Sequence, residues 1–265
     1  MSVELYEKYA AALAAARWDC EFVEYDWSNL PRQLDAMWLP YGMMLSEFSR
    51  EIANSLNDLT NYTRRLRAWS AVVAPMTDQE KMDTVHEFID SVAIVGLNLP
   101  AVIRSRFAFA AAHLCHQANR ALDGPAWKDN LRMDHQIELK DASKHGSRWS
   151  RYDPFRLRVE SIADQEYRDA THDFRNAYNH RLSPRVVIGL TQAVTRTVNP
   201  KSEAVSYAFG ALPALALDHV ADLLAAQCKR GRLAFEAFQD LVREHEKSIA
   251  EYSNASVPPS SRGAD

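Results

Sequence analysis

A long stripe of apolar residues near the C-terminus constrains the fold more than any other feature. Its members recur at intervals of three and four, and such positions share one face of an α-helix. The stripe therefore predicts one helix of unusual length that buries one face in a bundle. A coiled-coil seam is the alternative, but the flanking charge pairs typical of such a seam are not evident. The stripe comprises Leu217, Val220, Leu224, Cys228, Gly231, Phe235, Phe238, Val242, His245, Ile249 and Tyr252.

A second stripe predicts another long helix upstream. It runs from Leu45 to Val73 with the same spacing, and Ser, Asn, Glu and Arg fill the positions between. The chain of 265 residues contains only 8 Gly and 11 Pro, clustered in a few places. Because the most flexible residue and the helix breaker are both scarce, long stretches are free to propagate as helix. A mainly α fold is favoured.

Local signals predict where the central helices begin and end. Thr77-Asp-Gln-Glu80 matches a capping box, which predicts a helix from about Asp78 to Gly96. Leu99-Pro100 separates it from an apolar helix over residues 101–122, because proline interrupts helical hydrogen bonding. That second helix is expected to end at Asp123-Gly124-Pro125, a strong turn signal.

The second half of the chain is predicted to contain shorter elements. Apolar and polar residues alternate on both sides of a turn at 199–202, which predicts a β-hairpin near 185–210. The fold class is thus a helical bundle of about six to seven helices with an inserted hairpin, in a single domain over 1–253 followed by a disordered tail over 254–265. The remaining predicted segments are a helix over 126–143, a loop through Gly146 and Pro154, and a polar helix over 158–181.

Composition excludes several classes of protein. The chain carries 31 basic and 35 acidic side chains, a net charge of −4, so any binding to nucleic acid must be local. Cys20, Cys115 and Cys228 are widely spaced and odd in number, as expected of reduced thiols in a cytoplasmic protein. Glu4 and Glu7 stand where a secretory signal would be basic, and no run of about 18 apolar residues is present. We expect neither export nor a membrane partner.

The densest group of hydrogen-bonding side chains lies between residues 169 and 181. At 100° per residue, five of them fall within an arc of roughly 140° on the predicted polar helix. Asn and His are mediocre helix formers, so their clustering on one face favours a functional site over simple solvation. The alternative is that they cap the helix end or pair with surface charges. The five residues are His172, Arg175, Asn176, Asn179 and His180.

Arg175-Asn176-Ala-Tyr-Asn-His180 resembles the Arg-x(4–6)-His motif of the HEPN superfamily, a group of helical nucleotide- and RNA-binding domains. The specific part of the resemblance is these six residues. Arg106 and His113 also match the looser spacing, and we interpret that match as coincidence. The resemblance implies an endoribonuclease that needs no metal and no cofactor, that acts as a homodimer with two facing motifs, and that often serves as a toxin or anti-phage effector restrained by an antitoxin.

The residue types suit ribonuclease chemistry. RNA supplies its own nucleophile, the 2′-hydroxyl, so the protein must move protons and stabilise charge on phosphorus. His180 can act as general acid or base near neutral pH, and Arg175 presents a fork of donors to phosphate oxygens. Asn176 would orient the histidine or contact phosphate. The residues predicted to bind RNA are Asn179, His172, Lys144, Arg148, Arg151 and Arg181.

Lys144, Arg148 and Arg151 belong to a basic stretch over 140–158 that also contains Trp149, Tyr152 and Phe155. Cations interleaved with aromatic rings are typical of surfaces that bind single-stranded RNA, where rings stack on bases. The same pattern also arises when the aromatic side chains fix a loop to the core and the cations remain solvated. Both interpretations are open from the sequence.

Two further functions compete with the ribonuclease. The first keeps the fold without catalysis, as a module that binds RNA, a nucleotide or a protein. The second is a metal-dependent hydrolase, because three pairs of potential ligands lie three residues apart on predicted helices. Histidines within an apolar helix are more often core residues, so this function is the weakest of the three. The pairs are His113 and His116, Asp83 and His86, and Asp169 and His172.

Overall fold

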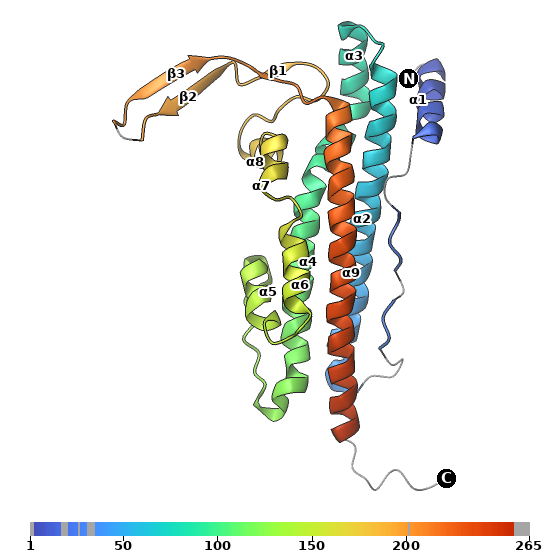
Figure 1. Ribbon diagram of the computed structural model, residues 1–265, viewed down its shortest axis with the longest axis vertical. Helices are drawn as coiled ribbons and strands as arrows, with labels where there is room; N and C mark the ends of the chain where they lie inside the picture. The colour runs from blue at the N-terminus through green and yellow to red at the C-terminus, as the bar shows by residue number, and fades with distance from the viewer. Residues whose placement is uncertain (1–2, 17–20, 26, 31–34, 201, 257–265) are drawn as a thin grey trace. The chain divides into compact units, whose positions relative to one another are not determined.

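Three long helices provide the framework of the protein (Figure 1). They are α2 (Leu39–Val73), α4 (Asp90–Asp123) and α9 (Leu217–Ser256). The two apolar stripes predicted α2 and α9, and the predicted mainly α fold with a hairpin is confirmed. The computed structural model describes residues 3–16, 21–25, 27–30, 35–200 and 202–256.

The chain divides into two compact units, and each of the long helices contributes a segment to both. The expectation of a single domain over 1–253 stays a prediction, because two compact units can belong to one domain. Unit 1 comprises Met1–Glu21, Asp58–Ala101 and Ala163–Cys228, and unit 2 comprises Phe22–Asn57, Val102–Ile162 and Lys229–Asp265.

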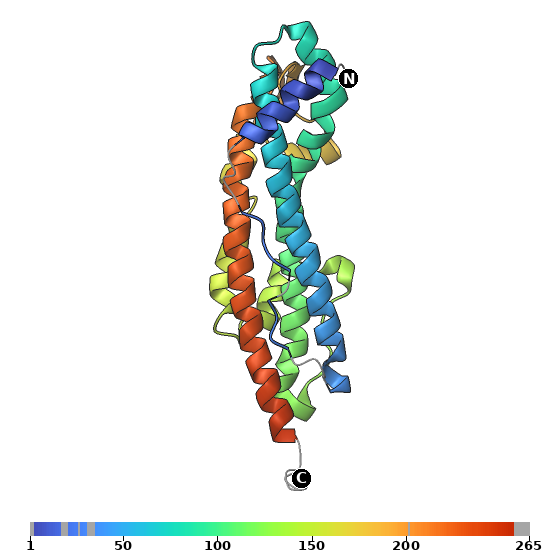
Figure 2. The same cartoon turned by 90° about the vertical axis from the view of Figure 1, so that its right-hand side faces the viewer.

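In unit 1 the segments of α2, α4 and α9 lie side by side, with short elements around them (Figures 1 and 2). Gly96 of α4 allows this close packing, because a Cβ there would lie 3.1 Å from Leu224 Cδ1 and 3.5 Å from Leu66 Cδ1. The short elements are α1 (Val3–Ala15), α3 (Asp78–Thr84), a π-helical turn (Val85–Ile89), α7 (Gln165–Ala170), α8 (Phe174–His180), β1 (Leu190–Thr191), β2 (Val194–Val198), β3 (Val205–Phe209) and β4 (Leu212–Pro213).

The capping box at Thr77 is confirmed, but the predicted break at Leu99-Pro100 is wrong. Thr77 accepts a hydrogen bond from the Glu80 amide, and the Glu80 carboxylate accepts one from the Thr77 amide. The helix that begins there continues through the π-turn into α4, with Pro100 inside it. An interior proline costs about 3 kcal/mol. Burial of α4 on both sides of Pro100, at Leu97 and Ile103, outweighs that cost.

Unit 2 buries aromatic side chains between its helices. The rings of Phe107, Phe155 and Phe238, from α4, α6 and α9, lie in mutual contact with centroids 5.9 Å apart. Tyr41 of α2 is also fully buried, and its hydroxyl lies 3.1 Å from Nδ1 of His245. The other helices of this unit are the 3₁₀ turns Ala36–Trp38, Gly124–Ala126 and Asp134–Gln136, together with α5 (Leu139–Gly146) and α6 (Tyr152–Glu160).

The predicted helix over 126–143 is wrong for most of its length, because α-helix begins only at Leu139, after a single 3₁₀ turn. Specific contacts hold the preceding segment in a non-helical path along α4. The Trp127 indole N–H donates to the His116 carbonyl at 3.0 Å, and Asp129 Oδ1 lies 3.0 Å from His116 Nε2. The predicted loop through Gly146 and Pro154 is present but shorter, because α5 extends to Gly146 and α6 already begins at Tyr152.

The predicted polar helix over 158–181 is wrong as one element. It consists of the end of α6, then α7, then α8. Ala163, His172 and Asp173 have positive φ angles of 47°, 52° and 51°, a left-handed conformation that stops helix propagation. Asp164 then caps α7 by accepting a hydrogen bond from the Tyr167 amide at 3.0 Å. His172 therefore lies outside the helix that carries Arg175 and His180.

The hairpin is confirmed, with a shorter extent than the alternation predicted. β2 and β3 pair antiparallel from Val194↔Phe209 to Val198↔Val205. Before them, only Leu190–Thr191 is strand, and it pairs with Leu212–Pro213. All ten residues of β2 and β3 are exposed.

The C-terminal end of the chain and the cysteines agree with the predictions in part. Helix α9 extends to Ser256, so residues 254–256 of the predicted tail are helical, and 257–265 lie outside the described residues. Cys115 and Cys228 are thiols that form no disulfide, as predicted, and both are buried, whereas Cys20 lies outside the described residues.

One helical segment, 78–126, is long and apolar enough to cross a membrane by length and composition alone. In its most apolar window, 44% of the residues are buried inside the protein, and the core helix of a soluble protein passes the same test. The expectation that the chain has no membrane partner stays a prediction.

We predict that Gly146→Ala destabilises the protein. Alanine favours helix over glycine by about 1 kcal/mol, so an unhindered substitution in α5 would stabilise. A Cβ at this position would overlap the buried ring of Tyr152. We expect a net loss of about 1–3 kcal/mol, seen as a lower Tm in thermal denaturation. Gly210→Ala is the matched control, because a Cβ there meets nothing within 4 Å. Equal Tm values for the two variants would contradict the overlap.

Candidate functional site

Helix α8 carries the motif and is fixed to unit 1 through one side. Phe174 and Ala177 are buried at 2% and 1% exposure. The neighbouring α7 is attached to α4 by Tyr167, whose buried hydroxyl donates to the Leu97 carbonyl at 2.9 Å. Gln227 of α9 accepts a hydrogen bond from the Ala163 amide at 2.9 Å, just before α7. These contacts fix which face of α8 is turned to solvent.

The predicted motif residues gather on that solvent face. Arg175, Asn176, Asn179 and His180 are all exposed. At 100° per residue they cover an arc of roughly 140° opposite the buried side of the helix. Four of the five predicted residues are thus brought together. His172 is exposed as well, but it lies in the turn before α8.

Asp173 is a member of this group that the motif did not predict. Its Oδ2 accepts a hydrogen bond from Asn176 Nδ2 at 2.8 Å and lies 3.3 Å from Arg181 Nη2. It therefore orients both an amide and a cation on the exposed face. Asp is favoured as an N-cap, but the predicted helix over 158–181 placed Asp173 inside a helix, so that signal did not single it out. Here the carboxylate accepts from a side chain, and no side-chain cap bond forms.

Arg175 and His180 are five positions apart, so their side chains leave α8 in directions that differ by roughly 140°. His180 is the last residue of the helix. Asn179 lies between the two and donates from Nδ2 to the Arg175 carbonyl at 2.8 Å. One copy of α8 therefore offers a guanidinium and an imidazole on the two flanks of one polar surface.

The basic stretch over 140–158 belongs to unit 2, where its aromatic residues are buried. Trp149 is 4% exposed, and its indole N–H donates to Asn119 Oδ1 at 3.0 Å. Tyr152 and Phe155 are 1% and 0% exposed. The interpretation as a stacking surface for bases is therefore wrong, because these rings hold the segment to the core.

The cations of the same stretch remain at the surface. Lys144, Arg148 and Arg151 are exposed. Arg148 forms an ion pair with Asp123 at 2.8 Å, which partly neutralises its charge. An exposed pair of this kind contributes little to stability, about 0–1 kcal/mol. The predicted contacts of these three residues with RNA stay predictions.

Buried histidines form a second polar cluster, in unit 2. The rings of His116 and His145 lie 4.8 Å apart, and both residues are 5% exposed. His113 Nε2 lies 3.3 Å from Asp134 Oδ1, beside the contact between His116 and Asp129. Within the described part of the chain, no three His, Cys, Asp or Glu side chains are arranged to hold a metal ion.

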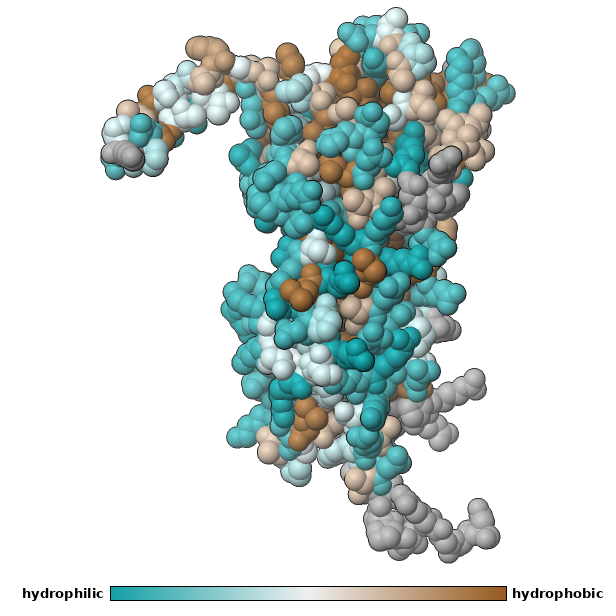
Figure 3. All heavy atoms as spheres, in the orientation of Figure 1, coloured by the Kyte–Doolittle hydropathy of each residue, from teal (hydrophilic) through white to brown (hydrophobic). Residues whose placement is uncertain are grey.

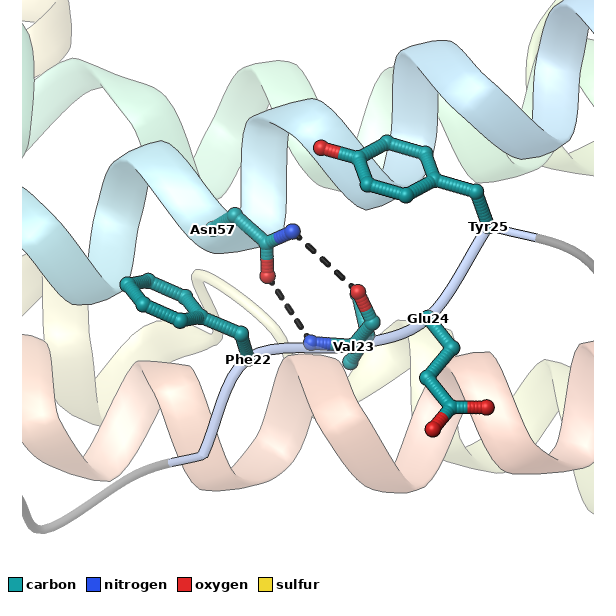
Figure 4. A pocket seen from close by; sticks show the side chains of 5 residues that line it. All are labelled: Phe22, Val23, Glu24, Tyr25 and Asn57. Atoms are coloured by element: carbon teal, nitrogen blue, oxygen red, sulfur yellow. Dashed lines mark hydrogen bonds between the residues drawn. The ribbon is translucent and has the colours of Figure 1, made fainter.

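An open pocket of about 690 Å³ is present in unit 2 (Figure 4). An extended segment lines it with Phe22, Val23, Glu24 and Tyr25, and α2 adds Asn57. The Asn57 amide binds the backbone of Val23 at both ends, with Oδ1 2.8 Å from the amide and Nδ2 3.2 Å from the carbonyl oxygen. Asn57 thus acts as a strand partner for the segment. The lining is mainly apolar and does not include the motif residues.

A scan against protein-family models found no match, and searches of the curated proteins and of the solved structures found no similar protein. The exposed group on α8 is the one set of described residues that combines a predicted motif with a shared surface.

We predict that the buried histidines destabilise the protein on acidification. Burial lowers the pKa of His145 to about 4 and that of His245 to about 3. The unfolded chain takes up these protons near pH 6.5, whereas the folded chain resists them. The stability that these two neutral histidines contribute is fully present above about pH 6.5. It falls by about 1.4 kcal/mol per pH unit for each histidine as the pH drops from 6.5 toward its folded pKa.

Urea denaturation between pH 7 and pH 5 measures this effect. His245→Gln should lower the dependence of stability on pH relative to the wild type, because one of the buried neutral imidazoles is removed. Parallel stability curves for the wild type and the variant would contradict the assignment.

Proposed function

We propose that the protein is a metal-independent endoribonuclease of the HEPN type and that α8 carries its catalytic groups. The observation that supports this is the joint exposure of Arg175, Asn176, Asn179 and His180 opposite the buried side of α8. The spacing of Arg175 and His180 is the one that the resemblance requires. A group of solvent-exposed side chains suits a polymeric substrate better than a small molecule.

In the proposed reaction, the 2′-hydroxyl of RNA attacks the adjacent phosphorus, and the bond from phosphorus to the 5′-oxygen breaks. The products are a 2′,3′-cyclic phosphate and a free 5′-hydroxyl. His180 removes the proton from the 2′-hydroxyl or delivers one to the leaving 5′-oxygen. Arg175 donates to the non-bridging oxygens as negative charge builds up on them. Asn176, oriented by Asp173, contacts the phosphate or the histidine.

Two copies of the chain complete the proposed site. A single α8 directs Arg175 and His180 to different flanks, so one imidazole cannot serve both proton transfers while the guanidinium holds the same phosphate. A homodimer with facing motifs supplies two of each group, one imidazole as base and the other as acid. The wider role that fits this activity is a cytoplasmic toxin or anti-phage effector, restrained by an antitoxin protein.

RNA contacts outside the catalytic groups are proposed for the remaining cations and amides. Asn179, His172 and Arg181 adjoin the motif along the chain. Lys144, Arg148 and Arg151 are candidates on unit 2. Asp173 opposes phosphate binding through its charge, and the nearby Arg181 offsets it.

A binding function without catalysis is the second candidate. It is favoured by the divergence of Arg175 and His180 on one α8, which leaves either group able to contact RNA alone. In that case RNA binds in a salt-dependent manner, because phosphate contacts release counterions, but no product forms.

We predict that the protein cleaves labelled single-stranded RNA in the presence of EDTA. Arg175→Ala and His180→Ala should each lower the cleavage rate by roughly 10²–10⁴-fold, because each removes proton transfer or charge stabilisation. The end group of the product, detected by its resistance to ligation until the cyclic phosphate is removed, identifies the reaction.

His219→Ala is the matched control, because His219 is an exposed histidine of unit 1 on α9. It should cleave as fast as the wild type. Failure of the wild type to cleave, together with salt-dependent binding, would replace the ribonuclease by the binding module. Equal cleavage by His180→Ala and wild type would remove α8 from the mechanism.

A further inference from the structure

The hairpin of unit 1 exposes large apolar side chains that the proposed ribonuclease does not use. Phe209 is 87% exposed and Tyr207 is 62% exposed. Val194, Val198 and Val205 are each about half exposed, at 49%, 47% and 48%. Figure 3 shows hydrophobic residues on the surface of this hairpin, which extends away from the helices of its own unit in Figure 1.

The register places these five side chains on one face. Residues paired across two antiparallel strands point to the same side of the sheet, and neighbours along a strand point to opposite sides. The pairs Val194↔Phe209, Arg196↔Tyr207 and Val198↔Val205 therefore share a face. We call it the hairpin face. The opposite side carries small or polar residues, namely Thr195, Thr197, Ser206 and Ala208.

An exposed apolar face of this kind requires a physical explanation. A single two-stranded hairpin is at best marginally stable in water, and it usually needs a packed face to persist. The five apolar side chains together expose on the order of 500 Å², the size at which a surface patch is commonly a contact site. Within the described residues, nothing covers any position of β2 or β3.

We propose that the hairpin face binds the hairpin face of a second copy of this chain, as two packed sheets. Two such faces bury roughly 1,000 Å² in total, which is the lower limit for a specific interface. The contact is thus large enough for a reversible dimer and needs no other partner. This contact is separate from the facing α8 motifs proposed above, and it does not rest on the ribonuclease activity.

The arrangement of charges selects one geometry for this dimer. Arg196 is the one charged side chain on the hairpin face, and it lies beside Tyr207. A two-fold axis parallel to the strands places β2 over β3 of the second copy. Each Arg196 then lies over the other copy's Tyr207, in a cation–π contact, while Val198 meets Val205 and Val194 meets Phe209. A two-fold axis across the strands would oppose the two arginines instead.

The composition of the hairpin face favours protein over RNA. Aromatic rings beside an arginine can stack on bases, but a surface for RNA also needs several cations to neutralise phosphates. Here three valines surround a single arginine. Valine has no planar ring to stack and no donor for phosphate, whereas it packs well between sheets.

Sedimentation velocity of the full chain tests the proposal. The wild type should show a reversible dimer in the micromolar range. Phe209→Lys should weaken it by at least about tenfold, because the most exposed ring of the face is replaced by a charge. Thr195→Lys is the matched control, since it adds the same charge to the opposite side and should leave the dimer intact. Unchanged far-UV circular dichroism shows that both variants are folded.

Cysteine cross-linking tests the geometry. Mixing Val198→Cys protein with Val205→Cys protein should give a disulfide-linked pair, whereas Val198→Cys alone should not. A monomeric wild type throughout the micromolar range, or equal weakening by Phe209→Lys and Thr195→Lys, would overturn the proposal. So would protection of the hairpin face by an RNA oligonucleotide in the absence of self-association.

Discussion

Burial of the apolar stripe of α9 is the constraint on which the remaining structure depends. In unit 1, α9 brings Leu224 against Gly96 of α4, where a Cβ would lie only 3.1 Å from Leu224 Cδ1. In unit 2, it supplies Phe238 to the aromatic cluster and His245 to the buried contact with Tyr41. A buried imidazole is tolerated because hydrogen-bonding groups surround it and it remains neutral. Some of the short elements pack onto the long helices, such as α7, whose Tyr167 hydroxyl donates to the Leu97 carbonyl of α4.

Periodicity predicted the long helices because their stability comes from one repeated contact. It failed where individual contacts decide the path. Pro100 was expected to end a helix, yet apolar burial on both sides of it outweighs a lost hydrogen bond. Residues 126–138 have helical spacing, yet Trp127 and Asp129 bind His116 and hold the chain in a non-helical path. Such contacts join residues that only the folded chain brings together, so no pattern of spacing contains them.

The sequence predicted which residues make up the candidate site, but only part of their arrangement in space. Four of its five residues share the exposed side of α8 because the period of a helix fixes which positions share a face. His172 was placed with them on the assumption of an unbroken helix, which positive φ angles at His172 and Asp173 interrupt. Neither residue type demands that conformation, although Asp and His adopt it more readily than most. The burial of Trp149 could not be predicted either, since a basic stretch with aromatic residues has the same sequence pattern whether its rings are exposed or buried.

The polar side of α8 and the hairpin face, both on unit 1, differ in the free energy of their exposure to water. The polar side of α8 is well solvated, and Phe174 and Ala177 supply its buried anchors. A helix of seven residues has little stability of its own, so α8 depends on these buried contacts for its conformation. The hairpin is different, because water solvates its outer backbone but not its apolar face. A polar surface stays solvated when no substrate is bound, whereas an apolar surface of this size favours association with a permanent or frequent partner.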